Sequence, residues 1–223
     1  MSEADPEQLA PLDPRDWTIR PPLPGGAERE AVSGVVRSAF GAADPEEGRT
    51  VAALVERLRG LWDEGRGFEL VAVAPDGPVG HVGLTRAYVD AVEELHHVLV
   101  LSPLAVDPAW QGRGIGQALV RGALEASGAA GYRLVFLEGA PSFYPKLGFR
   151  PGVGEGFAKP SARIPDAAFM VARTGAEDDA GAPPVAGALV YPEVFWETDT
   201  VGLRGELLRA LVPELFGGPA AGD

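Results

Sequence analysis

The residues best suited to chemistry form the run Gln111-Gly112-Arg113-Gly114-Ile115-Gly116, in which glycine occupies every second position. Glycine permits tight backbone dihedrals and leaves no β-carbon to block an approaching ligand. The following residues have an apolar face that includes Leu119 and Ala126, which indicates an amphipathic helix. A helix beginning at this run directs unpaired N–H groups and the positive end of its dipole outward. The run therefore predicts an anion site, most naturally for a phosphate or pyrophosphate.

An apolar strand leads into this run. Val98-Leu99-Val100-Leu101 and Leu104-Ala105-Val106 flank Pro103 and are apolar on both faces, which indicates a central strand covered on both sides. Pro103 cannot donate a ladder hydrogen bond, so the pairing is predicted to be interrupted there. The interruption exposes backbone N–H and C=O groups on the second segment, and these groups must find partners. A ligand with amides of its own would supply them.

Two common phosphate-binding loops do not fit the run. The Rossmann fingerprint needs a third glycine where this chain has Gln117, and the Walker loop needs a Gly-Lys-Ser/Thr ending that is absent. The run resembles instead the acyl-CoA-binding motif of the GNAT superfamily of N-acetyltransferases, Gln/Arg-x-x-Gly-x-Gly/Ala, which Gln111, Gly114 and Gly116 fill. A helix start whose glycines serve only the turn is the alternative interpretation.

The resemblance implies where acetyl-CoA would bind as the co-substrate. Residues 104–108 also resemble the family's fourth strand and its turn. The pantetheine chain is expected along Leu104, Ala105 and Val106, and a backbone N–H of this segment is expected to stabilise the developing oxyanion. The pyrophosphate is expected at Gln111, Gly112, Arg113, Gly114, Ile115 and Gly116.

A tyrosine further along the chain completes the resemblance. Tyr144, Gly148 and Phe149 match the Tyr-x-x-x-Gly-Phe context in which the family's tyrosine protonates the departing coenzyme A thiolate. The resemblance therefore implies that Tyr144 is catalytic. A packed aromatic side chain with a satisfied hydroxyl is the alternative.

The general base is not assigned from the sequence. Glu93, Glu94, His96 and His97 stand before or at the start of the central strand, a region where family members often use a carboxylate or a water chain. Solvated charge for the glutamates and packing for the histidines are the simpler interpretations of each residue.

Periodicity and turn signals place these motifs in a definite order of elements. The chain reads as a strand, two helices, antiparallel strands joined at Asp76-Gly77, the central strand, the glycine run, a helix and three further strands. A strand that returns after a helix favours a parallel neighbour by a right-handed crossover. We expect an α/β (α+β) fold: a GNAT-like mixed, largely antiparallel central sheet with a splayed parallel strand pair, flanked by helices. The predicted strands are 17–20, 68–74, 79–87, 96–106, 132–137, 167–173 and 184–194, and the predicted helices are 27–40, 51–62 and one from 115.

Three regions are predicted along the chain. Residues 1–16 read as a flexible tail, 17–194 as the acetyltransferase domain, and 195–223 as a C-terminal helical extension. The extension packs either on its own domain or on a second subunit, so a homodimer stays open. Within the domain, residues 151–160 are expected to form a glycine-rich loop able to close over the substrate.

Composition excludes several functions. The net charge of −13 without a basic run argues against nucleic acid or an anionic membrane as the partner, and it is compatible with a cationic amine. The absence of cysteine excludes disulfides, zinc–thiolate sites and cysteine nucleophiles, and three histidines are too few for a persuasive metal site. No signal peptide or membrane-spanning run is recognised, so a soluble cytoplasmic protein is expected.

The sequence therefore predicts an acetyl-CoA-dependent N-acetyltransferase that needs no metal. The acetyl group would pass by direct attack in a ternary complex to a primary amine of a small molecule or a protein. A non-catalytic acyl-CoA-binding regulatory module is the main alternative, and a phosphate-binding protein of another fold is a third. The acceptor, and any acyl group beyond acetyl, are not predicted.

Overall fold

The computed structural model describes residues 16–175 and 185–202. The predicted tail, except Asp16, and most of the predicted C-terminal extension lie outside the described residues. The helices are α1 (Gly26–Gly41), α2 (Pro45–Asp63), α3 (Ile115–Ala129) and α4 (Glu193–Glu197), with 3-10 turns η1 (Pro108–Trp110), η2 (Tyr144–Leu147) and η3 (Gly152–Glu155). The strands are β1 (Thr18–Arg20), β2 (Gly67–Ala74), β3 (Gly77–Asp90), β4 (Leu95–Val106), β5 (Leu134–Glu138), β6 (Arg150–Pro151), β7 (Phe157–Ala158), β8 (Phe169–Arg173) and β9 (Gly187–Val190).

The strands form one mixed sheet in the order β1-β2-β3-β4-β5-β8-β6. Strand β9 lies outside this path and pairs with both β3 and β7. Neighbours along the path are antiparallel except β4 and β5, which are parallel and flank the crossover through α3. The predicted fold class, with its largely antiparallel sheet and one parallel pair at the centre, is confirmed.

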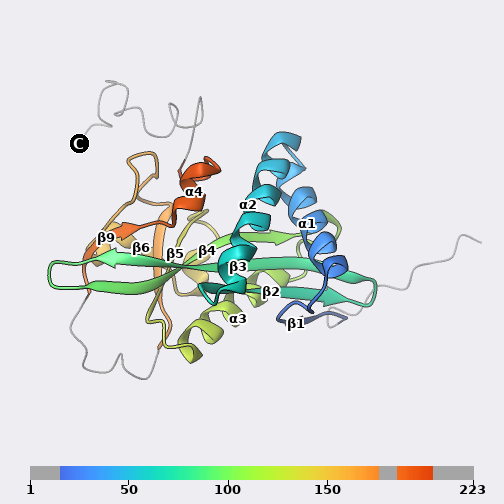
Figure 1. Cartoon of the computed structure of the whole chain (residues 1–223), viewed down its shortest axis with the longest axis horizontal. Helices are drawn as coiled ribbons and strands as arrows, with labels where there is room; N and C mark the ends of the chain where they lie inside the picture. Colours follow the sequence, from blue (N-terminus) through green and yellow to red (C-terminus); the bar gives the residue numbers. More distant parts are fainter. Residues whose placement is uncertain (1–15, 176–184, 203–223) are drawn as a thin grey trace, which may run out of the picture.

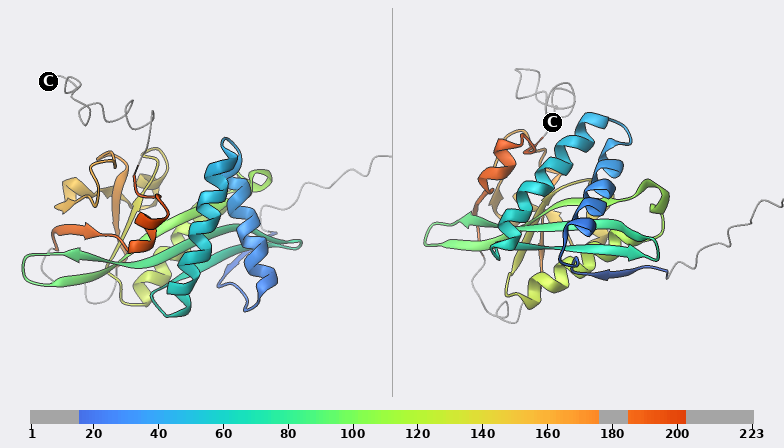
Figure 2. Two further views of the ribbon diagram at one scale, coloured as in Figure 1. Left: turned by 45° about the horizontal axis from the view of Figure 1, so that its top comes forward. Right: turned by 45° about the vertical axis from the view of Figure 1, so that its right-hand side comes forward.

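Helices cover both faces of the sheet. Helices α1, α2 and α4 lie on one face and α3 lies on the other (Figure 1). The α1–α2 pair stands side by side in both further views (Figure 2). Two hydrophobic clusters result, one under each layer, and Leu58 and Phe195 belong to the first while Leu119 belongs to the second.

Two glycines of β3 let the helices approach the sheet closely. A β-carbon at Gly80 would lie 3.0 Å from the Ile115 and Leu119 side chains of α3. A β-carbon at Gly83, on the opposite face, would lie 2.6 Å from the Trp62 ring of α2. The absence of a side chain at these two positions is therefore what lets both helix layers pack closely on the sheet.

Strand β4 changes its pairing where Pro103 predicts an interruption. Val82 of β3 faces Leu104 and Leu84 faces Leu101, so Gly83 alone stands opposite Ser102 and Pro103. This is a β-bulge, with two residues on one strand facing one on the other. On the other side, β4 pairs with β5 only at Leu99↔Val135 and Val100↔Phe136, and then the two strands part. The predicted splay is present, and the region between the unpaired ends of β4 and β5 is called the wedge below.

The chain also differs from expectation at three places. Helix α2 begins at Pro45, six residues earlier than expected, because the Asp44 side chain caps it by accepting from the Glu46 N–H and because proline suits a first helical turn. The last predicted strand, 184–194, is wrong in length, since β9 ends at Val190 and α4 follows. Residues 151–160 are not one long loop, because β6, η3 and β7 lie within them.

Candidate functional site

The glycine run forms an elbow between β4 and α3. Asp107 caps η1 by accepting from the Ala109 N–H at 2.9 Å, and the chain then turns through the left-handed region at Gly112 (φ 77°) and Gly114 (φ 81°). A β-carbon at either glycine would meet nothing within 4 Å, so the space outside the elbow is open. The sequence places glycine where side chains rarely adopt the required backbone angle.

The start of α3 leaves backbone donors for a ligand. The first bond of the helix runs from the Ala118 N–H to the Gly114 carbonyl at 3.0 Å, and no side chain caps Gly114. The N–H groups of residues 115–117 precede that bond, and such groups have no partner within a helix. An uncapped helix start with donors facing open space is suited to an anion.

The two polar side chains of the elbow have different roles. The Gln111 side chain donates to the Val106 carbonyl at 3.1 Å, so it ties the elbow to the end of β4. The Arg113 guanidinium lies 4.7 Å from the Trp110 ring centroid and 3.4 Å from the Ala109 carbonyl oxygen. Arg113 is exposed at the elbow, which leaves a positive charge beside the open corner.

The backbone N–H and C=O groups of Leu104, Ala105 and Val106 point alternately to the two sides of β4. The Asp107 N–H donates to the Val79 carbonyl of β3, and backbone groups alternate in direction along a strand. Ala105 therefore directs its backbone groups toward β3, whereas Leu104 and Val106 direct theirs into the wedge. Of the three residues expected to pair with pantetheine, two have their main chain on the open side.

Tyr144 lies at the far side of the wedge, under the end of β5. It begins η2, and its ring lies 4.9 Å from the Phe143 centroid and 5.6 Å from the Phe149 centroid. A β-carbon at Gly139 would lie 2.2 Å from the Tyr144 ring, so the ring rests against the backbone that follows β5. Burial raises the pKa of the Tyr144 hydroxyl to about 12, so the phenol holds its proton at neutral pH.

Gly116 links the elbow to this tyrosine segment. A β-carbon at Gly116 would make ordinary contacts, 3.6 Å from Phe143 and 3.7 Å from Val106. The first turn of α3, the end of β4 and the residue before Tyr144 therefore converge. The predicted strand, glycine run and tyrosine segment therefore meet at the start of α3.

The structure adds two residues that the sequence analysis missed, Glu138 and Tyr191. Glu138 ends β5, and its carboxylate accepts from the Gly202 N–H at 2.9 Å and from the buried Tyr191 hydroxyl. Burial raises the pKa of Glu138, although both hydrogen bonds and the nearby Arg163 charge oppose the rise. The signal available was one acidic residue directly after the apolar run 134–137. Tyr191 had no comparable signal.

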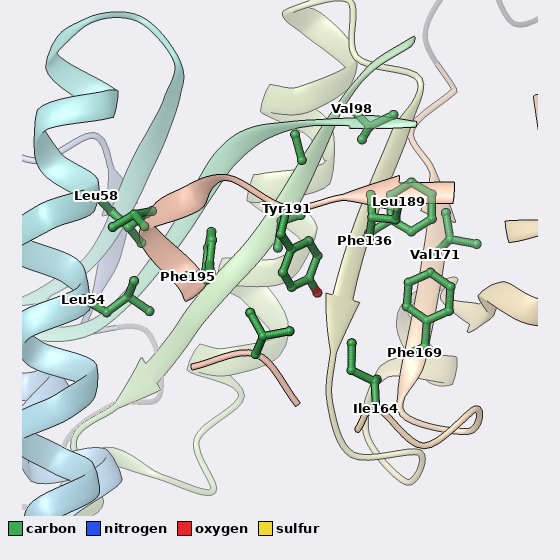
Figure 3. Packing of buried hydrophobic residues seen from close by; sticks show 14 of the residues in the cluster. Leu54, Leu58, Val98, Phe136, Ile164, Phe169, Val171, Leu189, Tyr191 and Phe195 are labelled. Atoms are coloured by element: carbon green, nitrogen blue, oxygen red, sulfur yellow. The ribbon is translucent and has the colours of Figure 1, made fainter. Parts of the chain in front are cut away.

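Figure 3 shows how this pair sits relative to the wedge. The ribbons of β4 and β5 diverge, and the Tyr191 ring lies between them with its oxygen directed toward the end of β5. Phe136, two residues before Glu138, belongs to the cluster on the α1–α2–α4 face. Because side chains alternate along a strand, Glu138 projects from that same face.

The base candidates considered from the sequence lie elsewhere. His96 and His97 belong to the first residues of β4, and Glu93 and Glu94 precede them in the turn. His96 is four positions before Val100, the last residue of β4 paired with β5, which is about 13 Å along a strand. The structure does not bring these four residues to the wedge.

Three comparisons place this architecture among known proteins. Residues 65–151 match the acetyltransferase (GNAT) domain family. The uncharacterized N-acetyltransferase YjhQ of Escherichia coli (strain K12) is 38% identical over 77 residues, which are 34% of this chain and 42% of that protein. The chain thus aligns with less than half of the length of this curated relative.

Two crystal structures extend the likeness over most of the fold. The GNAT N-acetyltransferase YhbS from Escherichia coli in complex with CoA has 25% identity and a TM-score of 0.69, covering 91% of this chain and all (100%) of that one. A GNAT acetyltransferase from Brucella melitensis in complex with acetyl-CoA shares the fold at 22% identity and a TM-score of 0.61, covering 80% of this chain and 97% of that one.

The sheet with its wedge and glycine elbow therefore defines an acetyltransferase-type α/β protein. More narrowly, residues 65–151 belong to the GNAT domain family, and the fold over 91% of the chain is shared with a GNAT N-acetyltransferase. The sequence-based recognition of the GNAT superfamily is confirmed.

Proposed function

We propose that this protein transfers an acetyl group from acetyl-CoA to a primary amine of a small molecule or a protein, by direct attack in a ternary complex. The observation that carries the proposal is the wedge. The glycine elbow with its unpaired N–H groups lies at one side of it, the unpaired edge of β4 lines it, and Tyr144 lies at the other side. The relatives solved with CoA and acetyl-CoA support the same co-substrate here.

In this proposal the chain holds acetyl-CoA largely by its main chain. The N–H groups of residues 112–117 bind the pyrophosphate, and the Arg113 guanidinium flanks it. The pantetheine amides pair with the backbone of Leu104 and Val106, whose groups face the wedge. Ala105 contributes the β3 pairing that keeps this edge in place.

The reaction needs little more than placement, because a thioester is already activated. The amine nitrogen forms a bond to the thioester carbonyl carbon, and a backbone N–H of β4 stabilises the oxyanion. The C–S bond then breaks, and the Tyr144 hydroxyl gives its proton to the leaving sulfur. The products are the acetamide and free coenzyme A.

The elbow is tested by Gly114→Glu. A side chain there is strained at φ 81°, and a carboxylate would repel the pyrophosphate, so acetyl-CoA affinity should fall at least about 100-fold by calorimetry. Gly131→Glu is the matched control, because Gly131 has φ 83°, has no atom within 4 Å of a β-carbon and follows the opposite end of α3. Unchanged affinity in Gly114→Glu would remove the elbow from the site.

The activity is tested with a panel of primary amines and detection of acetyl-CoA-dependent thiol release. At least one amine should be acetylated, with the product confirmed by mass spectrometry. Binding of acetyl-CoA without thiol release for any amine would favour the acyl-CoA-binding regulatory module instead.

The domain boundaries and setting remain part of the proposal. We assign the catalytic domain to residues 17–194, but Phe195 and Val201 pack in the same core, so the packed region continues past that limit. Among the described residues, no helix is long and apolar enough to cross a membrane. A cytoplasmic location and a homodimer are proposed from composition and from the apolar C-terminal extension alone.

A further inference from the structure

Resting on the proposed acetyl transfer, we infer that Glu138 is the general base that accepts the proton of the attacking amine, and that Tyr191 and the Gly202 main chain position its carboxylate at the wedge.

The first argument is position. Val100 and Phe136 are the last paired residues of the parallel strands β4 and β5. Ser102 and Glu138 each follow the last paired residue of their strand by two positions, so the same register would bring them opposite one another where pairing has ended. Glu138 is thus at the point where the strands begin to part, beside the bulge of β4.

The second argument is the division of the two faces. Glu138 projects on the α1–α2–α4 face, whereas Tyr144 belongs with the residues packed on the α3 face. Gly139, the next residue in the chain, is in contact with the Tyr144 ring. A thioester in the wedge would therefore have a carboxylate on one side and a phenol on the other, at the same end of β5.

The third argument is the chemistry of the surroundings. The described hydrogen-bond partners of Glu138 are neutral, the Tyr191 hydroxyl and the Gly202 N–H. The cation whose charge acts on Glu138 is Arg163, which donates to the Val201 carbonyl at 3.0 Å, and within residues 16–175 and 185–202 the two form no ion pair. Glu138 is half-buried, so it is partly desolvated and still able to exchange its proton with water. Burial also raises its pKa toward the range in which a carboxylate is an effective base.

The proton balance is complete with these residues. Glu138 takes one proton from the amine nitrogen as the C–N bond forms, and Tyr144 gives one proton to sulfur as the C–S bond breaks. Glu138 then loses its proton to solvent, and the Tyr144 phenolate regains one. No further reactant is needed.

The test uses Glu138→Gln in the full chain with the best amine from the panel. Gln keeps the shape: its carbonyl oxygen can accept from the Gly202 N–H, and its NH2 group can donate to the Tyr191 hydroxyl oxygen, so the fold should be retained by circular dichroism. We expect kcat to fall about 100-fold or more while acetyl-CoA affinity changes less than about twofold. Glu94→Gln, at the other end of β4, is the matched control and should keep full activity.

The pH dependence separates a base from a structural residue. In the wild type, kcat/KM should fall as pH drops through the raised pKa of Glu138, above the ordinary 4.5, and Glu138→Gln should lose this acid limb. The Tyr191 hydrogen bond favours the carboxylate, so Tyr191→Phe should move the limb upward by about one pH unit. An active Glu138→Gln variant with an unchanged acid limb would overturn the inference.

One measurement is independent of turnover. Carboxyl carbon NMR of the isotopically labelled protein should show Glu138 titrating above 4.5, and higher still in Tyr191→Phe. The inference would be overturned, even without a substrate, if Glu138 titrated at or below 4.5 and its titration midpoint did not change in Tyr191→Phe. Failure of the whole amine panel would instead count against the acetyl transfer itself.

Discussion

Two glutamates, Glu69 buried and Glu138 half-buried, project from the same face of the sheet and have opposite surroundings. Glu69 of β2 is 8% exposed, lies 2.8 Å from His81 Nε2 and is 3.9 Å from the buried Arg59 guanidinium. Glu138 of β5 is bound by a phenol and a backbone N–H, beside the wedge.

The difference indicates which carboxylate is available for chemistry. Glu69 lies under α1 and α2, where Arg59 also binds the Arg29 carbonyl and the Glu56 carboxylate, so its cluster joins the helices to the sheet. Removing the Glu69 carboxylate takes one of two counter-charges from the buried Arg59, which then keeps only Glu56. Within the part of the chain that the structure describes, Glu138 forms no ion pair, and in the proposed reaction its position at a strand end lets it reach the substrate.

The largest effect that tests this contrast is expected for Glu69→Gln. Loss of the carboxylate leaves Arg59 and His81 poorly compensated in the interior, so the free energy of unfolding should fall by about 3 kcal/mol in urea titrations. Folded Glu69→Gln should keep the acid limb of the wild-type activity. A variant with normal stability and altered pH dependence would reverse the roles assigned to the two glutamates.

Tyr144→Phe should have the next largest effect. The ring contacts with Phe143 and Phe149 remain, whereas the proton donor is lost, so kcat should fall about 30-fold with acetyl-CoA affinity nearly unchanged. Because the pKa of Tyr144 is raised to about 12, wild-type activity should show no loss from its ionisation below about pH 11. Full activity of the phenylalanine variant would show that the phenol is only a packing group.

Gly139→Ala tests whether the end of β5 positions the phenol. The added methyl would fall 2.2 Å from the ring, so Tyr144 must move and kcat should drop about tenfold. In the double variant with Tyr144→Phe, Gly139→Ala should cause no further loss of kcat. Gly122→Ala in α3 is the control, since a β-carbon there makes contacts of 3.6 Å or longer and Gly122 lies outside the elbow. Additive losses in the double variant would contradict coupling between the two positions.

The smallest effect is expected for Thr85→Val, near Glu69. The Trp62 Nε1–H donates to the Thr85 hydroxyl at 3.0 Å, and the isosteric change leaves that donor buried and unpaired. Stability should fall by about 1 kcal/mol in thermal or urea unfolding, and kcat should not change. A loss of activity comparable to that of Glu138→Gln would extend the reacting region to the α2 side of the sheet.

Local features of the sequence were enough to predict the sheet and the elbow. Each glycine of the 111–116 run acts through its own backbone angle or contact space, and Pro103 marks the bulge directly. The order of strands followed from alternation and turn signals, with errors at α2 and α4. Asp44-Pro45 is a typical helix N-terminal capping sequence, which apolar periodicity alone did not detect.

The buried polar residues could not be predicted in the same way. Arginine is usually solvent-exposed, but Arg59 is only 3% exposed. The Glu138–Tyr191 contact joins residues 53 positions apart (191 minus 138). Such pairing depends on strand register and on the return of the chain through β9, neither of which a local pattern records.

The bulge in β4 limits which side chains position 83 of the neighbouring strand can accept. Gly83 stands opposite the bulge, and a β-carbon there would lie 2.6 Å from Trp62 and 3.0 Å from the Ser102 carbonyl. Gly83 therefore has the bulge of β4 on one side and the Trp62 indole of α2 on the other. A side chain larger than glycine at position 83 would therefore require the Trp62 ring or the bulge of β4 to move, which links the shape of the bulge to the packing of α2.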